Sequence, residues 1–121
     1  MVKMIDIPTM NDARGSLSVI ENLVDFEIKR VYYIYNTDGE QRGGHRHKKT
    51  DQLLVCVSGS YSVFCENELK NSEMFILDKP TKALYVETKD WHTMQDFSQD
   101  CVLLILASEF YDVNDYIDER Y

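Results

Sequence analysis

The sequence contains no long hydrophobic segment, and this absence argues against a membrane-spanning helix. Its longest apolar run, residues 102–107, is far shorter than the roughly 20 residues that cross a bilayer. The first residues do not resemble a signal peptide, because Asp6 and Pro8 interrupt any apolar stretch there. Basic residues are also few: 13 Lys and Arg stand against 21 Asp and Glu, a formal net charge of −8. This balance argues against general nucleic-acid binding, which depends on basic surface, but not against a small anionic ligand held by a local basic cluster.

Cysteine is scarce as well. Cys56, Cys65 and Cys101 each lie in or beside an apolar run, and an odd number without a secretory signal is a poor disulfide framework. We therefore expect three small buried thiols and a cytoplasmic protein. A chain of 121 residues, 44% of them hydrophobic, is expected to form one domain, residues 1–121, with a core that needs no disulfides.

Short runs rich in β-branched and aromatic residues recur along the chain, with turn signals between them. This pattern predicts an all-β sandwich or barrel. Only the last ten residues favour a short C-terminal helix, because Asp112 is a capping residue and more acids follow it. The strands expected from the pattern are residues 16–21, 28–35, 53–57, 61–65, 74–77, 83–87 and 101–107.

Two of the three histidines, His45 and His47, stand two residues apart in a basic segment that follows two glycines. If this segment is a strand, both imidazoles and Lys49 share one face. Two imidazoles on the inner face of a barrel are costly to bury without partners. The pair is therefore a candidate functional site rather than core packing.

The spacing around this pair resembles the first sequence motif of the cupins. Gln52 stands where the motif has a metal-binding glutamate, and His92 aligns with the histidine of a much altered second motif. The resemblance implies a small jelly-roll cupin barrel with all three histidines at cupin ligand positions. Because a neutral amide is a poorer ligand than a carboxylate, we expect no metal in the site.

A narrower resemblance covers almost the whole chain. It is to the WxcM-like cupins, the ketoisomerases that move the ketone of a dTDP-linked 4-keto-6-deoxyhexose from C4 to C3. Departures from that pattern are Lys89 and Asp90 before Trp91, and Arg46 between the two histidines. The segments that carry the resemblance, in the order of the family, are residues 12–17 (DARGSL), 26–35 (FEIKRVYYIY), 42–49 (RGGHRHKK), 55–60, 91–92, 96–98, 100–108, 111–112 and 115–117.

The resemblance implies proton transfer through an enediol, with no redox cofactor. A histidine, whose ordinary pKa is near 6.5, can take and return a proton near neutral pH. We assign His47 as the leading base and His45 as its partner, and the sequence leaves open which imidazole serves each step. By match to the family tyrosine, Tyr33 is the expected hydroxyl acid or enediolate donor, with Tyr35 in reserve.

The diphosphate of such a substrate requires cations. Arg14 and Arg42, each followed by glycine as in the family, are the expected partners, since guanidinium groups suit phosphate oxygens. Lys49 is a weaker electrostatic candidate for the diphosphate, and Trp91 is expected to line the pocket beside His92.

Three other functions remain open at this point: a metal-dependent cupin enzyme, a sugar 3,5-epimerase, and a non-catalytic cupin that binds sugar nucleotides. The resemblance also implies a homodimer, which would cover exposed strand edges. The stereochemistry at C4 of the product is not readable from the sequence.

Overall fold

The computed structural model describes residues 2–121, and its regular structure is almost entirely β, as predicted. One three-residue turn of 3-10 helix, η1 (Val113–Asp115), is the only helical element among these residues. None of their helices is long and apolar enough to cross a bilayer. The strands are β1 (Lys3–Asp6), β2 (Thr9–Asp12), β3 (Gly15–Ser18), β4 (Arg30–Ile34), β5 (Arg42–His47), β6 (Gln52–Ser58), β7 (Tyr61–Glu66), β8 (Ser72–Leu77), β9 (Lys82–Val86), β10 (Trp91–Gln95), β11 (Val102–Ala107) and β12 (Tyr116–Ile117).

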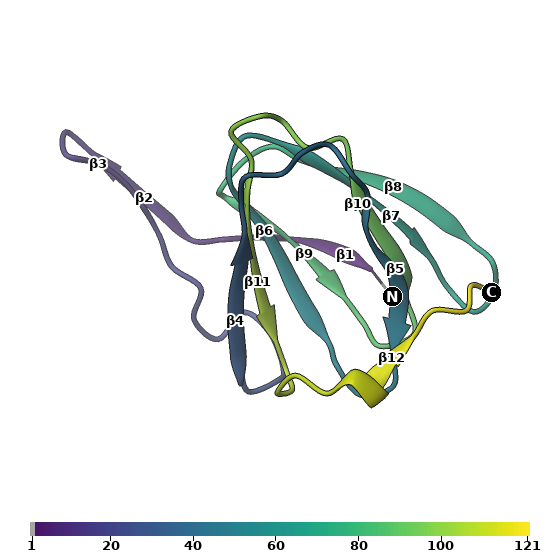
Figure 1. Ribbon diagram of the computed structural model, residues 1–121. Helices are drawn as coiled ribbons and strands as arrows, with labels where there is room; N and C mark the ends of the chain where they lie inside the picture. The colour runs from purple at the N-terminus through teal and green to yellow at the C-terminus, as the bar shows by residue number, and fades with distance from the viewer. Residues whose placement is uncertain (1) are drawn as a thin grey trace.

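Two five-stranded antiparallel sheets face each other (Figure 1). The first has the order β1-β9-β6-β11-β4, and the second has the order β12-β5-β10-β7-β8. Strands distant in the sequence are therefore neighbours in space, and β5 and β10 pair in the second sheet. This pairing brings the two histidine-bearing segments together.

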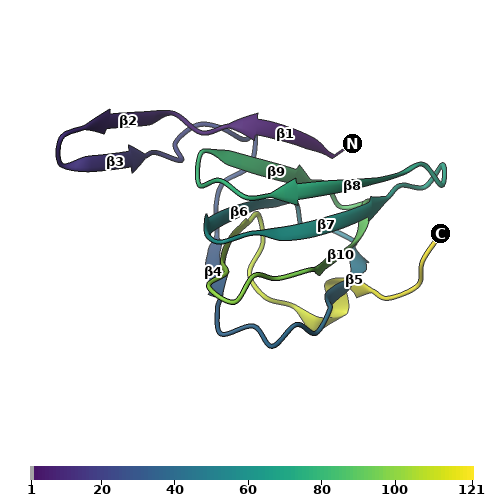
Figure 2. The same ribbon diagram turned by 90° about the horizontal axis from the view of Figure 1, so that it is seen from above.

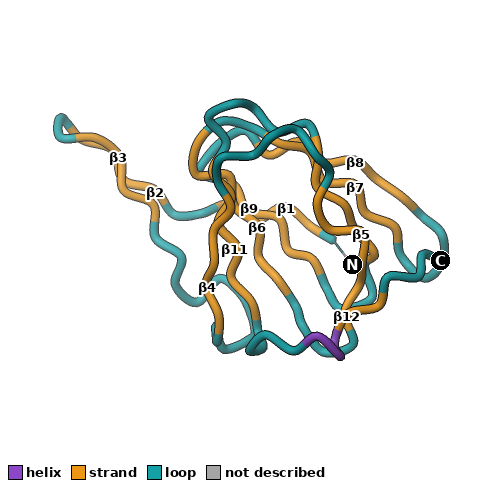
Figure 3. Tube along the Cα trace, viewed as in Figure 1, coloured by secondary structure: helices purple, strands orange, loops and turns teal. Residues whose placement is uncertain are grey.

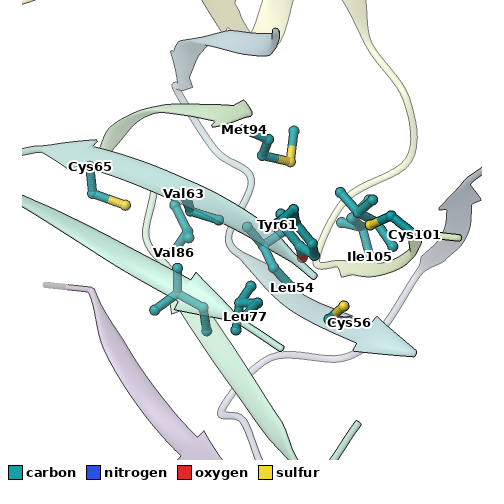
Figure 4. Close-up of a cluster of buried hydrophobic side chains, with 12 residues drawn as sticks. Leu54, Cys56, Tyr61, Val63, Cys65, Leu77, Val86, Met94, Cys101 and Ile105 are labelled. Atoms are coloured by element: carbon teal, nitrogen blue, oxygen red, sulfur yellow. The ribbon is translucent and has the colours of Figure 1, made fainter. Parts of the chain in front are cut away.

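The main core lies between the sheets. In β6 and β11, alternate residues such as Leu54 and Ile105 face the opposite sheet, as expected of half-buried strands (Figure 4). Tyr61 and Val63 of β7 meet them from the other side. All three cysteines are free thiols buried in this cluster, which confirms the expectation for them.

A second, smaller cluster covers the outer face of the first sheet. Leu53, Val55 and Leu106 point outward there and are packed by side chains of the segment that follows β3, among them Ile20 and Leu23. β6 and β11 are consequently buried on both faces, which explains why their sequences are continuous apolar runs rather than strict alternations.

The hairpin of β2 and β3 forms a separate two-stranded sheet and extends away from the sandwich (Figure 2). Its residues are nearly all exposed, including Met10 and Leu17.

The C-terminal helix expected from the sequence is not formed. The chain makes one 3-10 turn and then pairs Tyr116 and Ile117 with β5 as strand β12 (Figure 3). Asp112 does cap this turn, since its side chain accepts a hydrogen bond from the backbone N–H of Asn114. Pairing with His47 and Arg46 of β5 stops the turn from propagating, so tertiary contacts override the local preference.

Candidate active site

A cavity of about 340 Å³ opens between the two sheets and is closed on one side by the C-terminal segment. Three strands contribute arginine or histidine side chains to its wall, and tyrosines contribute aromatic rings. This composition suits a polar ligand that contains a ring. The residues that line it are Arg30, Tyr32, Ile34, Arg42, Gly43, His45, Gln52, Leu54, His92, Met94, Tyr111 and Tyr116.

Gly43 allows β5 to lie unusually close to β10. Its φ is +81°, in the region that favours glycine, and a Cβ placed on it would lie 2.9 Å from the carbonyl oxygen of His92. The pairing shifts register at this point, with His92 opposite His45 and Thr93 opposite Gly43. The glycine before the histidine pair therefore helps to bring histidines from two strands together.

The three histidines form one cluster at the base of the cavity. The ring centroid of His45 lies 5.0 Å from that of His47 and 5.3 Å from that of His92, both in edge-on arrangements. Tyr116 packs against His45 and His47, with 4.7 Å between ring centroids in each case. His45 and His92 line the cavity, whereas His47 is buried behind them.

Burial keeps the cluster neutral. It is the main cause that lowers the pKa of His45 to about 4, and the neighbouring His47 acts in the same direction. Burial, followed by the charge of His45, lowers the pKa of His92 to about 3. Burial also lowers the pKa of His47, although Asp115 opposes the shift. At neutral pH all three imidazoles are therefore available as proton acceptors.

His47 is held by a buried carboxylate from the C-terminal turn. Its Nδ1 lies 3.0 Å from Oδ2 of Asp115, and Oγ1 of Thr50 donates to the same oxygen at 2.5 Å. The backbone N–H of Lys49 donates to Oδ1 of Asp115 at 2.7 Å. The other ring nitrogen of His47, Nε2, is buried and has no hydrogen-bond partner among the residues described.

Two arginines supply positive charge to the cavity. Neither Arg30 nor Arg42 forms an ion pair with a carboxylate anywhere in residues 2–121. The guanidinium of Arg30 lies over the rings of Tyr32 and Tyr111, and its Nε is buried without a partner. Unpaired guanidinium groups in a cavity wall favour an anionic ligand.

The structure places Tyr33 outside this cavity, which corrects its expected position. β4 alternates as predicted, but the face that points inward carries Arg30, Tyr32 and Ile34. Tyr33 is 64% exposed on the outer face, where it stacks on Tyr35, its expected substitute. The β4 tyrosine that lines the cavity is therefore Tyr32, whose hydroxyl accepts a hydrogen bond from Nε2 of Gln52 at 2.9 Å. Burial is the main cause that raises the pKa of Tyr32, so its hydroxyl keeps its proton.

Three more expected binding residues do not line the cavity. Arg14 lies in the turn of the projecting hairpin and pairs with Asp12. Lys49 belongs to a neighbouring surface depression beside Asp112. Trp91 lies on the outer face of its sheet, where its Nε1 donates to the carbonyl oxygen of Asp118, because alternation along β10 turns His92 and Met94 inward.

No group of three or more His, Cys, Asp or Glu side chains within residues 2–121 has the geometry to hold a metal ion. The position of Gln52 is consistent with this finding. It lies in the cavity wall, where the amide contacts Tyr32 instead of supplying a carboxylate to the histidines.

A sequence model of the family described as FdtA: WxcM-like, C-terminal matches residues 1–121. The chain belongs to this family. A relative in Aneurinibacillus thermoaerophilus, a TDP-4-oxo-6-deoxy-α-D-glucose 3,4-oxoisomerase, is 48% identical over 118 residues, which cover 95% of this chain and 84% of that protein.

Solved structures of 3,4-ketoisomerases match the fold closely. A double variant of the QdtA 3,4-ketoisomerase of Thermoanaerobacterium thermosaccharolyticum, in complex with TDP, has a TM-score of 0.93 and 41% identity, over 98% of this chain and 87% of that one. The WlaRB TDP-quinovose 3,4-ketoisomerase of Campylobacter jejuni has a TM-score of 0.92 and 42% identity, over 98% and 92%. The cupin barrel expected from the sequence is thereby confirmed.

Sequence reasoning missed several residues of the site in this WxcM-like chain. Arg30 and Tyr32 were visible as one face of a strand, but the sequence does not say which face is inside. Asp115 and Tyr116 contact the histidines because the C-terminal segment runs back along β5. No local sequence pattern predicts this course of the chain.

Proposed function

We propose that this chain is a 3,4-ketoisomerase that moves the ketone of a dTDP-linked 4-keto-6-deoxyhexose from C4 to C3, and that it needs no redox cofactor. The observation that carries the proposal is a neutral histidine cluster in the wall of a cavity that also holds two unpaired arginines. Relatives named as 3,4-oxoisomerase or 3,4-ketoisomerase, at 41% to 48% identity over nearly the whole chain, support this substrate class.

The reaction is a redox-neutral proton rearrangement, so the residues need only move protons. A base removes the proton from C3, beside the C4 ketone, and an enediolate forms. A proton then returns to C4, the C3 hydroxyl gives up its proton to leave a ketone at C3, and the C4 oxygen takes up a proton to become a hydroxyl. Neutral imidazoles suit both directions of such transfer.

We propose that His45 and His47 share these transfers. His45 lines the cavity and is the imidazole placed to touch the sugar, while His47 lies edge-on behind it. Our assignment of His47 as the leading base stays a prediction, and it requires access through its free Nε2.

The remaining cavity residues suit the charges of the substrate. Arg42 and Arg30 are the proposed partners of the diphosphate, because both have unpaired guanidinium groups. Tyr32 replaces Tyr33 as the proposed donor to the enediolate oxygen, since its protonated hydroxyl lines the cavity. His92 completes the wall behind the reacting carbons.

We also propose that the protein is a cytoplasmic homodimer of single-domain chains. The projecting hairpin exposes two large apolar side chains, Met10 (60%) and Leu17 (55%). Exposed apolar side chains favour contact with another protein, and the partner proposed here is a second copy of this chain. Arg14 would then contact a diphosphate only in the cavity of the second copy. Three buried free thiols fit a reducing compartment.

The test is turnover of dTDP-4-keto-6-deoxyglucose followed by NMR of the product, with authentic 3-keto isomers as references. A 3-keto product, lost in folded His45→Asn and His47→Asn variants that still bind dTDP, would support the proposal. A 4-keto product epimerised at C5 would indicate the epimerase instead, and tight binding without turnover would indicate a sugar-nucleotide-binding protein. Near-normal turnover by both variants would remove the histidine pair from the mechanism.

A further inference from the structure

We propose that Asp115 is a positioning residue that fixes the tautomer of His47, with the proton on Nδ1 and the lone pair on Nε2. This inference rests on the proposed proton-transfer role of the histidine pair, but its structural half can be measured without any turnover. Asp115 lies in the C-terminal turn, 68 residues from His47 in the sequence.

The hydrogen bonds to Asp115 leave one arrangement of protons. A carboxylate only accepts hydrogen bonds. Its Oδ1 accepts from the backbone N–H of Lys49, which cannot reverse its direction. Its Oδ2 lies 3.0 Å from Nδ1 of His47, so Nδ1 must carry a proton to make this contact favourable.

Asp115 stays a carboxylate although it is 4% exposed. Burial alone would raise its pKa, but hydrogen bonds from Thr50, His47 and Lys49 outweigh burial and leave the pKa lowered. The group that faces Nδ1 is therefore an acceptor throughout the neutral pH range.

The opposite nitrogen of His47 is left as the proton acceptor. Nε2 is buried and without a hydrogen-bond partner among residues 2–121, and the ring is packed by Tyr116 and His45. The two nitrogens of an imidazole point away from each other, so Nε2 is turned away from Asp115. An unpaired buried acceptor costs stability, which is typical of a group kept for function rather than for folding.

The turn that carries Asp115 is itself fixed to the histidine strand. The backbone N–H of Lys48 donates to the carbonyl oxygen of Asp115 at 2.9 Å, and Tyr116 pairs with His47 as β12. The backbone and the side chain of Asp115 are thus both hydrogen-bonded to residues 47–50. Such double attachment holds the imidazole in one orientation.

The test is the variant Asp115→Asn. With Oδ1 kept on the N–H of Lys49, the new amide N–H would point at Nδ1 of His47 and force its proton to Nε2. In 15N spectra of histidine-labelled protein, assigned by comparison with His47→Asn, we expect the His47 signals to change from the Nδ1–H to the Nε2–H pattern. We expect kcat to fall about 10²-fold or more, with KM and dTDP affinity nearly unchanged.

The matched control is Thr50→Val, which removes the hydroxyl donor to the same oxygen and leaves the contact between Asp115 and His47. It should keep the Nδ1–H tautomer and most of kcat, even if the protein is less stable. A kcat loss in Thr50→Val equal to that in Asp115→Asn would mean that general loosening of the network is responsible, and would overturn the proposal.

The wild-type spectrum is decisive even if Asp115→Asn does not fold. An Nε2–H tautomer of His47 in the wild type contradicts the proposal outright. A changed tautomer in Asp115→Asn with normal kcat also contradicts it. By contrast, a wild type that shows Nδ1–H but has no ketoisomerase activity would refute the proposed function and not the tautomer assignment.

Discussion

Replacing Gly43 with alanine should separate the two strands that carry the histidines. A Cβ at this position would lie 2.9 Å from the carbonyl oxygen of His92 and 3.2 Å from the Cα of Thr93, both of them backbone atoms that cannot turn aside. β5 must then move away from β10, and His45 moves with it. We therefore expect loss of activity as well as loss of stability.

Gly44→Ala is a matched control. Gly44 has the same φ of +81°, but a Cβ there would have no heavy atom within 4 Å. Its cost is the left-handed backbone alone, about 1–2 kcal/mol. Gly43→Ala adds the overlap, typically about 1–3 kcal/mol for overpacking. For 121 residues, about 1 kcal/mol corresponds to a Tm change of about 4 °C.

The assay compares Tm and kcat of the two variants at a temperature where both are folded. We expect Tm to fall by about 4–8 °C in Gly44→Ala and by about 8–20 °C in Gly43→Ala, with kcat clearly reduced only in the second. If both variants lost the same amount of Tm and had the same kcat, the close approach of β5 to β10 would contribute to neither stability nor activity. That result would refute this account of the site.

Three further outcomes follow from the cavity. Because burial lowers the pKa of His45 to about 4, its neutral form persists on acidification, so kcat/KM should fall only towards pH 4; an acid limb near pH 6.5 would argue against His45 as the base. Tyr32→Phe should lower kcat by about 10-fold or more through loss of a donor, whereas Tyr33→Phe on the outer face should leave kcat unchanged; the reverse order would restore Tyr33 as the donor. Exhaustive chelation should leave activity intact, since Gln52 offers the histidines no carboxylate; activity that is lost and then restored by added metal would contradict this.

The fold was predictable because its signals are local. Alternation and turn residues located seven strands, and β6 follows the predicted residues 53–57 to within one residue at each end. Of the other five strands, β5 was considered only as a conditional strand for its histidines, and the remaining four are polar or short, as in β2 and β12. β12 exists only because β5 is available to pair with it, and a stretch of acids after a capping residue otherwise favours a helical turn.

The site was predictable only where spacing within one strand carries the chemistry. His45 and His47 fall on one face of β5 as expected, and Arg42 lies on the same cavity wall. The period of a strand defines two faces but not which one points into the sandwich. Tyr33 and Tyr32 are equally good phenols by sequence, and only the packing of Ile34 against the core decides between them.

Asp115 illustrates the opposite limit. An aspartate among other acids near the end of a chain is usually a solvated side chain, and nothing in its neighbours distinguishes it. It becomes part of the site because the C-terminal turn buries this carboxylate beside His47, whose Nε2 is buried without a hydrogen-bond partner among residues 2–121. A buried carboxylate needs several donors to remain charged, and β5 with the residues after it supplies a backbone N–H, a hydroxyl and an imidazole N–H. The same contacts that make the burial tolerable therefore also determine the protonation of His47, so the stability of the C-terminal segment and the chemistry of the histidine pair depend on one side chain.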